Sequence, residues 1–409
     1  MIRSFAQVGG GQAAYTLFQG LFVLASVRFL APQALAEFSI GIAIFTIASG
    51  LSTSALRRAY ILDYEELGLS SAQGHFLAAQ VLLLIAGALV ITVLSGVSAE
   101  VSLSLIALIV ANTIFENARL FFQRHESFRN FGLLTALQPA VGLLGLAALL
   151  AMGAAGVHWA AAGWAVLLSQ AASRLVLLPL FGRRIVPLFT GATDGRSILA
   201  VLRHLLLHRY YLLSLYYGIL NWLLTSGMFF LSRAGNELET AAYGATQRYY
   251  GILLALVITA QSVLLPALAK AETLQQSRGV IRSYYVICLP LTAALAVVAF
   301  AATWWIPLVD GGKYPSSVPS FQILAAMVAI SLWTSIHSTI VTKEKKYVAL
   351  LLYAVGGAVV TTTLSALSPP SAFSVALATA IGFALSSIAV AIHSELLMRK
   401  ADSRTDDVV

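Results

Sequence analysis

The sequence predicts an all-α protein that crosses a membrane about twelve times, and three observations predict it. The 409 residues are 59% hydrophobic and only 10% charged, with a mean hydropathy of +0.86, whereas soluble proteins carry about 25% charged residues. Apolar runs of about 20 residues, the length that a helix needs to cross a bilayer, recur along the whole chain. These runs are continuous rather than alternating, which argues against a transmembrane barrel.

The expected spans follow from the length of each apolar run and from the polar residues that flank it. They cover residues 9–30, 38–61, 74–95, 101–122, 132–152, 157–181, 210–232, 240–268, 281–303, 316–341, 347–367 and 372–397.

The basic residues predict which ends of the spans face the cytoplasm. With the N-terminus placed in the cytoplasm, every Lys and Arg except Arg28, Arg233, Lys313 and Arg248 falls on the cytoplasmic side, as the positive-inside rule requires. Both termini are therefore expected in the cytoplasm. The net charge of +8 reflects this topology. Because the charge is spread over loops, it gives no reason to expect nucleic-acid binding.

A basic interval divides the chain into two similar parts. Residues 182–209 are too polar to span a membrane, and their second part, 197–207, has the spacing of a helix lying on the membrane surface or belongs to an ordinary basic loop. We expect an N-terminal lobe of six spans at 1–181, a C-terminal lobe of six at 210–398, and a cytoplasmic tail at 399–409. Two lobes with the same sidedness predict parallel repeats, which usually meet around a substrate site.

No pattern in the sequence predicts catalysis, a metal site or an ATP-hydrolysing domain. The phosphate-binding GxxxxGK[ST] motif is absent. His204 and His208 lack a carboxylate at metal-ligand spacing, and Cys288 alone cannot form a disulfide framework. A cleavable signal is not expected at the N-terminus. We therefore expect a protein that is not an enzyme and needs no cofactor, driven by a proton or sodium gradient or by membrane potential.

Arginines at or inside spans are the candidate substrate contacts, because a charge in hydrocarbon costs several kcal/mol unless it meets water or a partner. Arg248 lies about two turns into the eighth span, beside Gln247 and Tyr249. One interpretation is a cation that faces a central cavity and suits a phosphate or diphosphate. The other is an arginine that reaches the outer interface or pairs with Glu237 or Glu239.

Four further arginines carry the same two interpretations. Arg57 and Arg58 end the second span, Arg28 ends the first, and Arg174 lies in the inner part of the sixth. Each is a candidate substrate contact or a marker of the membrane interface.

Two carboxylates near span ends are the candidate ion-coupling residues. Glu116 precedes Arg119 by three residues on one helix face, so an intrahelical ion pair is expected. Glu37 lies at the start of the second span, where the N-terminus of a helix accommodates an acid.

Four stretches resemble one family of transporters. Residues 28–58, 121–139, 243–271 and 311–327 are similar to the multidrug/oligosaccharidyl-lipid/polysaccharide (MOP) flippase superfamily, and within it to the polysaccharide transporter branch of Wzx-type flippases. The resemblance covers nearly the whole chain. It implies two six-helix lobes around a central cavity that opens alternately to each side, with a polyprenyl-diphosphate-linked oligosaccharide as cargo.

The resemblance also implies roles for particular residues. In the lipid II flippases of the superfamily, arginines hold the diphosphate; Arg248 matches the arginine of the eighth span, and Arg57 and Arg58 fall near the pair that ends the second. This sequence departs from those flippases because only Arg28 represents the basic cluster of their first span, and their two extra C-terminal spans are not expected here. Both departures argue against lipid II as cargo.

The function expected from the resemblance is a flippase of the bacterial inner membrane. Its cargo would be an O-antigen or exopolysaccharide repeat unit, for lipopolysaccharide or exopolysaccharide synthesis, and its partners would be membrane lipid and the glycan polymerase or export machinery. A MATE-like drug or cation antiporter on the same fold is the first alternative, although the deep acidic residue typical of such exporters is not found. A lipid II-type flippase is less favoured. A membrane glycan polymerase is disfavoured because every outer loop is short.

Overall fold

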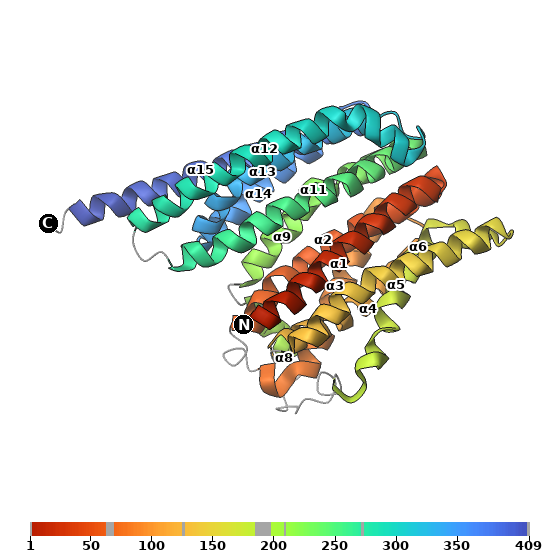
Figure 1. Ribbon diagram of the computed structural model, residues 1–409, viewed down its shortest axis with the longest axis horizontal. Coiled ribbons are helices and arrows are strands. Elements are labelled where there is room, and N and C mark those ends of the chain that lie inside the picture. The colour runs from red at the N-terminus through yellow and green to blue at the C-terminus, as the bar shows by residue number, and fades with distance from the viewer. Residues whose placement is uncertain are drawn as a thin grey trace. The chain divides into compact units, whose positions relative to one another are not determined.

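The computed structural model describes residues 2–62, 69–124, 127–184, 198–207, 210–270 and 274–406, and nearly all of them are helical (Figure 1). No strand occurs in these ranges. The chain forms two compact units, Met1–Asn221 and Trp222–Val409. The all-α prediction is therefore confirmed.

Unit 1 contains six long helices or helix pairs and a short helix that follows them. The elements are α1 (Ile2–Phe29), α2 (Pro32–Leu62), α3 (Leu69–Ser95), α4 (Ala99–Arg124), α5 (Phe128–Ala154), η1 (His158–Ala161), α6 (Gly163–Leu175), η2 (Leu178–Arg184) and α8 (Ile198–Leu207). Helix α9 (Tyr210–Thr225) begins in unit 1, and its last residues belong to unit 2.

Unit 2 continues with one short helix and five long ones. These are α10 (Gly227–Arg233), α11 (Glu237–Lys270), α12 (Leu274–Asp310), α13 (Ser317–Lys343), α14 (Tyr347–Leu367) and α15 (Ala372–Asp406).

The helices of the described residues fit the twelve expected spans. Eight are long and apolar enough to cross a membrane, and α9 with α10, which are bent by 45° at the break between them, are long and apolar enough as a pair. Helices α1, α3 and α11 are 28, 27 and 34 residues long and coincide with the remaining three expected spans. The sequence placed single spans at 157–181 and 210–232, whereas the structure breaks both into shorter helices.

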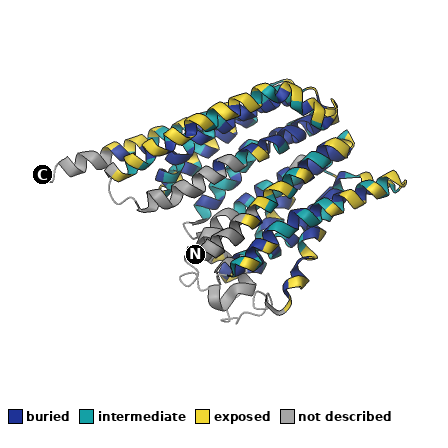
Figure 2. Ribbon diagram, in the orientation of Figure 1, coloured by how far each residue is buried: buried dark blue, intermediate teal, exposed yellow. Residues whose placement is uncertain are grey.

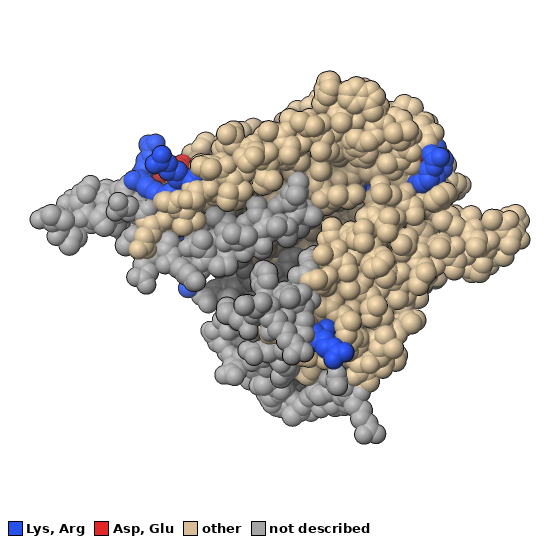
Figure 3. All heavy atoms as spheres, in the orientation of Figure 1, with Lys and Arg blue, Asp and Glu red and all other residues tan. Residues whose placement is uncertain are grey.

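The outer faces of several helices are apolar, as lipid contact requires. Val297, Phe300 and Leu308 of α12 are 66%, 70% and 79% exposed, and this helix is largely yellow in Figure 2. The face drawn in Figure 3 has wide areas of described residues without any charged atom. A soluble protein rarely exposes apolar patches of this extent, so these faces are suited to acyl chains.

In each unit, a carboxylate near the start of one helix, α2 in unit 1 and α11 in unit 2, caps the N-terminus of a later helix. In unit 1, the backbone N–H of Gly163, the first residue of α6, donates to Glu37 Oε2 at 3.1 Å. In unit 2, the N–H of Ala372, the first residue of α15, donates to Glu239 Oε2 at 2.7 Å. The N-terminal N–H groups of a helix have no intrahelical acceptor, so an anion there stabilises it. The same device in both units is what parallel repeats would produce.

Close packing at the start of α6 explains why glycine stands at position 163. A Cβ at Gly163 would overlap the carbonyl oxygen of Ala34 and lie 2.6 Å from the Glu37 Cβ. The first turn of α2 can therefore reach α6 only because no side chain separates them. Glu37 is held by this contact, which accounts for its presence at the start of α2.

Residues 198–207 form helix α8. The sequence left open whether this part of the chain is a helix or an ordinary loop, and the structure has a helix. Val201 is buried, whereas Leu199 is 73% exposed, and α8 packs against α3. Its exposed leucine fits a helix on the membrane surface, and that location stays a prediction. Residues 185–197 of the expected basic linker lie outside the described part of the chain.

We expect Glu239→Ala to destabilise the protein because it removes the cap of α15. Loss of a helix cap costs roughly 1 kcal/mol, which lowers the melting temperature by about 2 to 4 °C for a unit of this size. Thermal unfolding in detergent measures it. Glu237→Ala is the matched control, because Glu237 lies exposed in the same first turn of α11. An equal fall in melting temperature in both variants would show that the effect comes from the negative charge of that turn. It would contradict a specific role of Glu239 in capping α15.

Candidate functional site

A polar pocket of about 280 Å³ lies inside unit 1, and all six of its long helices contribute to the lining. Polar side chains come from Tyr15 of α1, Ser49 of α2, Gln80 of α3, Asn112, Glu116, Asn117 and Arg119 of α4, Gln138 of α5 and Arg174 of α6. Asn112, Glu116 and Arg119 are spaced by four and three residues, so α4 presents them on one face. The pocket is thus a polar interior in an apolar bundle.

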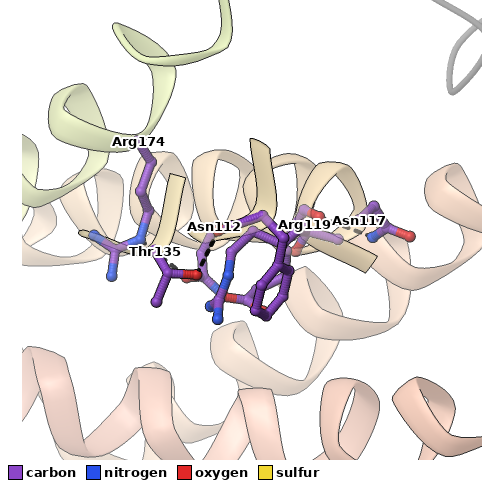
Figure 4. A network of polar contacts seen from close by, with 8 residues as sticks. Asn112, Asn117, Arg119, Thr135 and Arg174 are labelled. Carbon is purple, nitrogen blue, oxygen red and sulfur yellow. Dashed lines mark hydrogen bonds and ion pairs between the residues drawn. The ribbon is translucent and has the colours of Figure 1, made fainter. Parts of the chain in front are cut away.

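Arg174 enters the pocket from the last turn of α6 and is fixed by three hydrogen bonds. Its Nε donates to Asn112 Oδ1 at 2.9 Å, and its Nη1 donates to the carbonyl oxygen of Gln170 at 2.6 Å and to Gln170 Oε1 at 3.3 Å. Figure 4 shows the guanidinium beside Asn112. All three acceptors are neutral, so they orient the guanidinium and leave its charge without compensation from these contacts.

Arg119 and Glu116 form the expected ion pair. Arg119 Nη1 lies 2.6 Å from Glu116 Oε1, and the side chains are 13% and 23% exposed. The guanidinium also lies 5.2 Å from the ring centre of Phe131, a cation–π distance. With Arg174, the pocket lining carries two formal positive charges and one negative charge, so it attracts anions.

Two donors in the pocket have no protein acceptor among the described residues. These are Nε2 of Gln138, a residue only 5% exposed, and Nε of Arg119. Asn117 contrasts with them, because its Nδ2 donates to Gln80 Oε1 at 2.9 Å and to the Thr113 carbonyl at 2.8 Å. A buried donor without a partner costs about 1–3 kcal/mol. Such donors are therefore suited to an acceptor-rich ligand.

The pocket's size limits what part of a ligand it can hold. Whole drug-sized ligands usually occupy about 300–1,000 Å³, and the volume here is about 280 Å³. A phosphate or diphosphate group fits such a space, whereas an oligosaccharide does not.

The predicted residues of the eighth span lie in unit 2, on α11. Gln247 Nε2 donates to the carbonyl of Leu224 at 2.8 Å and to Tyr243 Oη at 2.9 Å. This carbonyl lies in the last turn of α9, before the break that precedes α10, so Gln247 stabilises the bent span. Tyr249 is 1% exposed and packs edge to face on Trp305 and Phe321, with ring centres 5.2 and 6.2 Å away. Arg248 between them is half-buried.

Among known proteins, the chain matches solved structures. No protein-family model and no curated protein sequence matches the chain. A structure described as the lipid II flippase MurJ in an inward closed conformation has a TM-score of 0.68 at 12% identity, over 95% of this chain and 90% of that one. An inward-facing MATE-family multidrug resistance transporter has 0.57 at 17% identity, over 98% and 99%. A MOP superfamily transporter from Pyrococcus furiosus has 0.53 at 14% identity, over 98% and 95%.

The chain has the MOP transporter fold. At these identities the likeness concerns the fold, and it agrees with the expected two six-helix lobes.

Within this fold the predicted site residues separate into groups. Arg174 and Glu116 meet in the pocket of unit 1, Glu37 caps α6, and Arg28 is exposed at the end of α1. Arg57 and Arg58 belong to the last turns of α2, and their side chains lie outside the described part of the structure.

Sequence reasoning missed the amides of the pocket, which are Gln80, Asn112, Asn117 and Gln138. The available signal was an amide inside an otherwise apolar run, in the third, fourth and fifth expected spans. That signal is weak alone, because polar side chains also join helices to one another in membranes.

We expect Gln138→Leu to leave the stability of the ligand-free protein unchanged or to raise it, because the variant removes a buried donor that lacks an acceptor. Gln80→Leu is the matched control, since it breaks the bond to Asn117 and should cost about 1 kcal/mol. Melting temperatures of the two purified variants measure the difference. A fall in melting temperature in Gln138→Leu as large as in Gln80→Leu would show that the Gln138 side chain already has a hydrogen-bond partner.

Proposed function

We propose that this protein flips a polyprenyl-diphosphate-linked oligosaccharide across the bacterial inner membrane by alternating access. The observation that carries the proposal is the pocket of unit 1, with two guanidinium groups, one carboxylate and two donors that lack an acceptor among the described residues. Charges inside a membrane bundle are costly and mark sites of function. A diphosphate supplies both the negative charge and the acceptor oxygens that this lining lacks.

The place of the pocket along the helices supports a cargo loaded from the cytoplasm. Arg119 lies in the C-terminal part of α4, and Arg174 in the last turn of α6. The basic loops predict that both ends are cytoplasmic, which is where an inner-membrane flippase would collect its cargo. Bacterial inner-membrane location and cytoplasmic termini are parts of the same proposal.

The likeness to a lipid II flippase supports a lipid-linked cargo. The sugar is too large for the pocket, so only the phosphate groups would enter it, while the polyprenyl chain would stay in lipid. We extend the proposal to the Wzx-type branch, with O-antigen or exopolysaccharide repeat units as cargo and a glycan polymerase or export machinery as partner. Arg248, Arg57 and Arg58 remain proposed substrate contacts outside the lining of this pocket.

A drug or cation antiporter on the same fold is the second candidate, because MATE-family transporters share this fold. The pocket lining is unfavourable to cations, since its one carboxylate, Glu116, is paired with Arg119. A cationic drug would enter a space with an excess of positive charge. Lipid II itself is a further candidate with the same phosphate chemistry.

Binding of geranylgeranyl diphosphate tests the proposed function. We expect this probe to raise the melting temperature of the full-length protein in detergent, by an amount that corresponds to about 2.7 kcal/mol at 100 times Kd. In Arg174→Gln the affinity should fall at least about tenfold, because a charge-assisted hydrogen bond contributes about 1.5–3 kcal/mol. Arg282→Gln, at an exposed position of α12, should bind as the wild type does.

Two further probes separate the candidates. Geranylgeraniol, which lacks the diphosphate, should stabilise the protein far less, because the phosphate groups supply the specific contacts. Ethidium represents the cationic drugs. Stronger stabilisation by ethidium than by the diphosphate, or full diphosphate affinity in Arg174→Gln, would contradict the proposed cargo.

A further inference from the structure

His337 is a buried histidine in α13 of unit 2, and one of its ring nitrogens is bonded to a tyrosine. It is 5% exposed. Its Nε2 lies 2.8 Å from the hydroxyl oxygen of Tyr285 on α12. Its Nδ1 is buried and has no hydrogen-bond partner among the described residues. When Nε2 carries the hydrogen and donates it to Tyr285, Nδ1 keeps a free lone pair that can accept a proton.

Among the described residues of the helices packed on α13, one charged group interacts with His337. Glu395 of α15 is close enough to interact electrostatically with both His337 and Tyr285. Helix α14 contributes Tyr353, whose hydroxyl is bonded to His393 of α15 at 3.2 Å. On α12, Tyr284 is bonded to the hydroxyl of Ser335 at 2.6 Å. Side chains 258–275, at the end of α11 and the start of α12, lie outside the described part. Glu395 is therefore the described acid that can balance a charge on His337.

We propose that His337 is a proton-binding site that couples transport to the proton gradient. The proton adds to Nδ1, Nε2–H keeps its bond to Tyr285, and the resulting imidazolium is balanced by the Glu395 carboxylate. The coupling role rests on the proposed transport function, whereas proton binding itself does not.

The chemistry of the site favours a proton over a sodium ion. Hard cations prefer several oxygen ligands, and here the open position is an aromatic nitrogen. Imidazole is the side chain whose ordinary pKa lies closest to neutral pH, so it is the group best suited to take up and release a proton. The anion pocket lies in unit 1 and the histidine in unit 2, so the proton would bind in a different unit from the phosphate pocket.

Tryptophan fluorescence of the full-length protein in lipid nanodiscs tests proton binding. Trp333 lies one turn before His337, and its ring centre is 5.2 Å from that of Tyr285, so a charge on His337 should change its emission. We expect a step in the emission as the pH falls, which Trp333→Phe reduces and His337→Gln abolishes. Tyr285→Phe should shift the pH at the midpoint of this step, because it removes the hydroxyl bonded to His337. This variant tests the role of His337 without replacing the histidine.

His393→Gln is the matched control, because this histidine is also bonded to a tyrosine, and it should keep the step. A step that persists in His337→Gln, or that His393→Gln removes equally, would overturn the proton site. Melting temperatures establish that each variant is folded.

Transport by proteoliposomes tests the coupling. The probe is a polyprenyl diphosphate carrying a fluorescent disaccharide, and an imposed pH gradient should accelerate its flipping in the wild type but not in His337→Gln. Equal acceleration in both would refute the coupling. If the wild type does not flip this probe and the fluorescence step is still present, the proposed cargo fails while the proton site stands.

Discussion

The cost of placing charge inside an apolar bundle is the constraint on which the site in unit 1 depends. A guanidinium in hydrocarbon costs several kcal/mol unless it is solvated or paired, and six helices enclose two of them. Glu116 compensates Arg119, whereas Arg174 is held by the neutral acceptors of Asn112 and Gln170. The excess positive charge remains, together with donors of Gln138 and Arg119 that lack an acceptor among the described residues, and the proposed anion would satisfy both.

The two units resemble each other in their framework and differ in their chemistry. Each uses a carboxylate near the start of one helix to cap a later helix, Glu37 for α6 and Glu239 for α15. These caps fix helix ends and need no cargo. Inside the units the polar residues differ, since the pocket of unit 1 combines Arg119 and Arg174 with amides, whereas unit 2 contains the buried His337–Tyr285 pair besides Gln247 and Arg248. Similar frameworks with different interiors are consistent with the proposed phosphate pocket in unit 1 and the proposed proton site in unit 2.

The fold was largely predictable from sequence because span length and loop charge are local properties. The run from residue 317 to 343 needs no partner to be recognised as a helix. The break between α9 and α10 was not predictable, because it depends on the Leu224 carbonyl being taken by Gln247, 23 residues away. The pocket was missed for the same reason: Arg174 meets Asn112 across 62 residues, and Asn117 meets Gln80 across 37. The Glu116–Arg119 pair, three residues apart, was predicted.

The most direct measurement is a cryo-EM map of the full-length protein in nanodiscs with geranylgeranyl diphosphate. The account predicts density for the phosphate groups within hydrogen-bond distance of Arg174, Arg119 and Gln138, with the apolar tail outside the pocket. Phosphate density bound elsewhere, with the pocket holding ordered water alone, would contradict an anion site in unit 1.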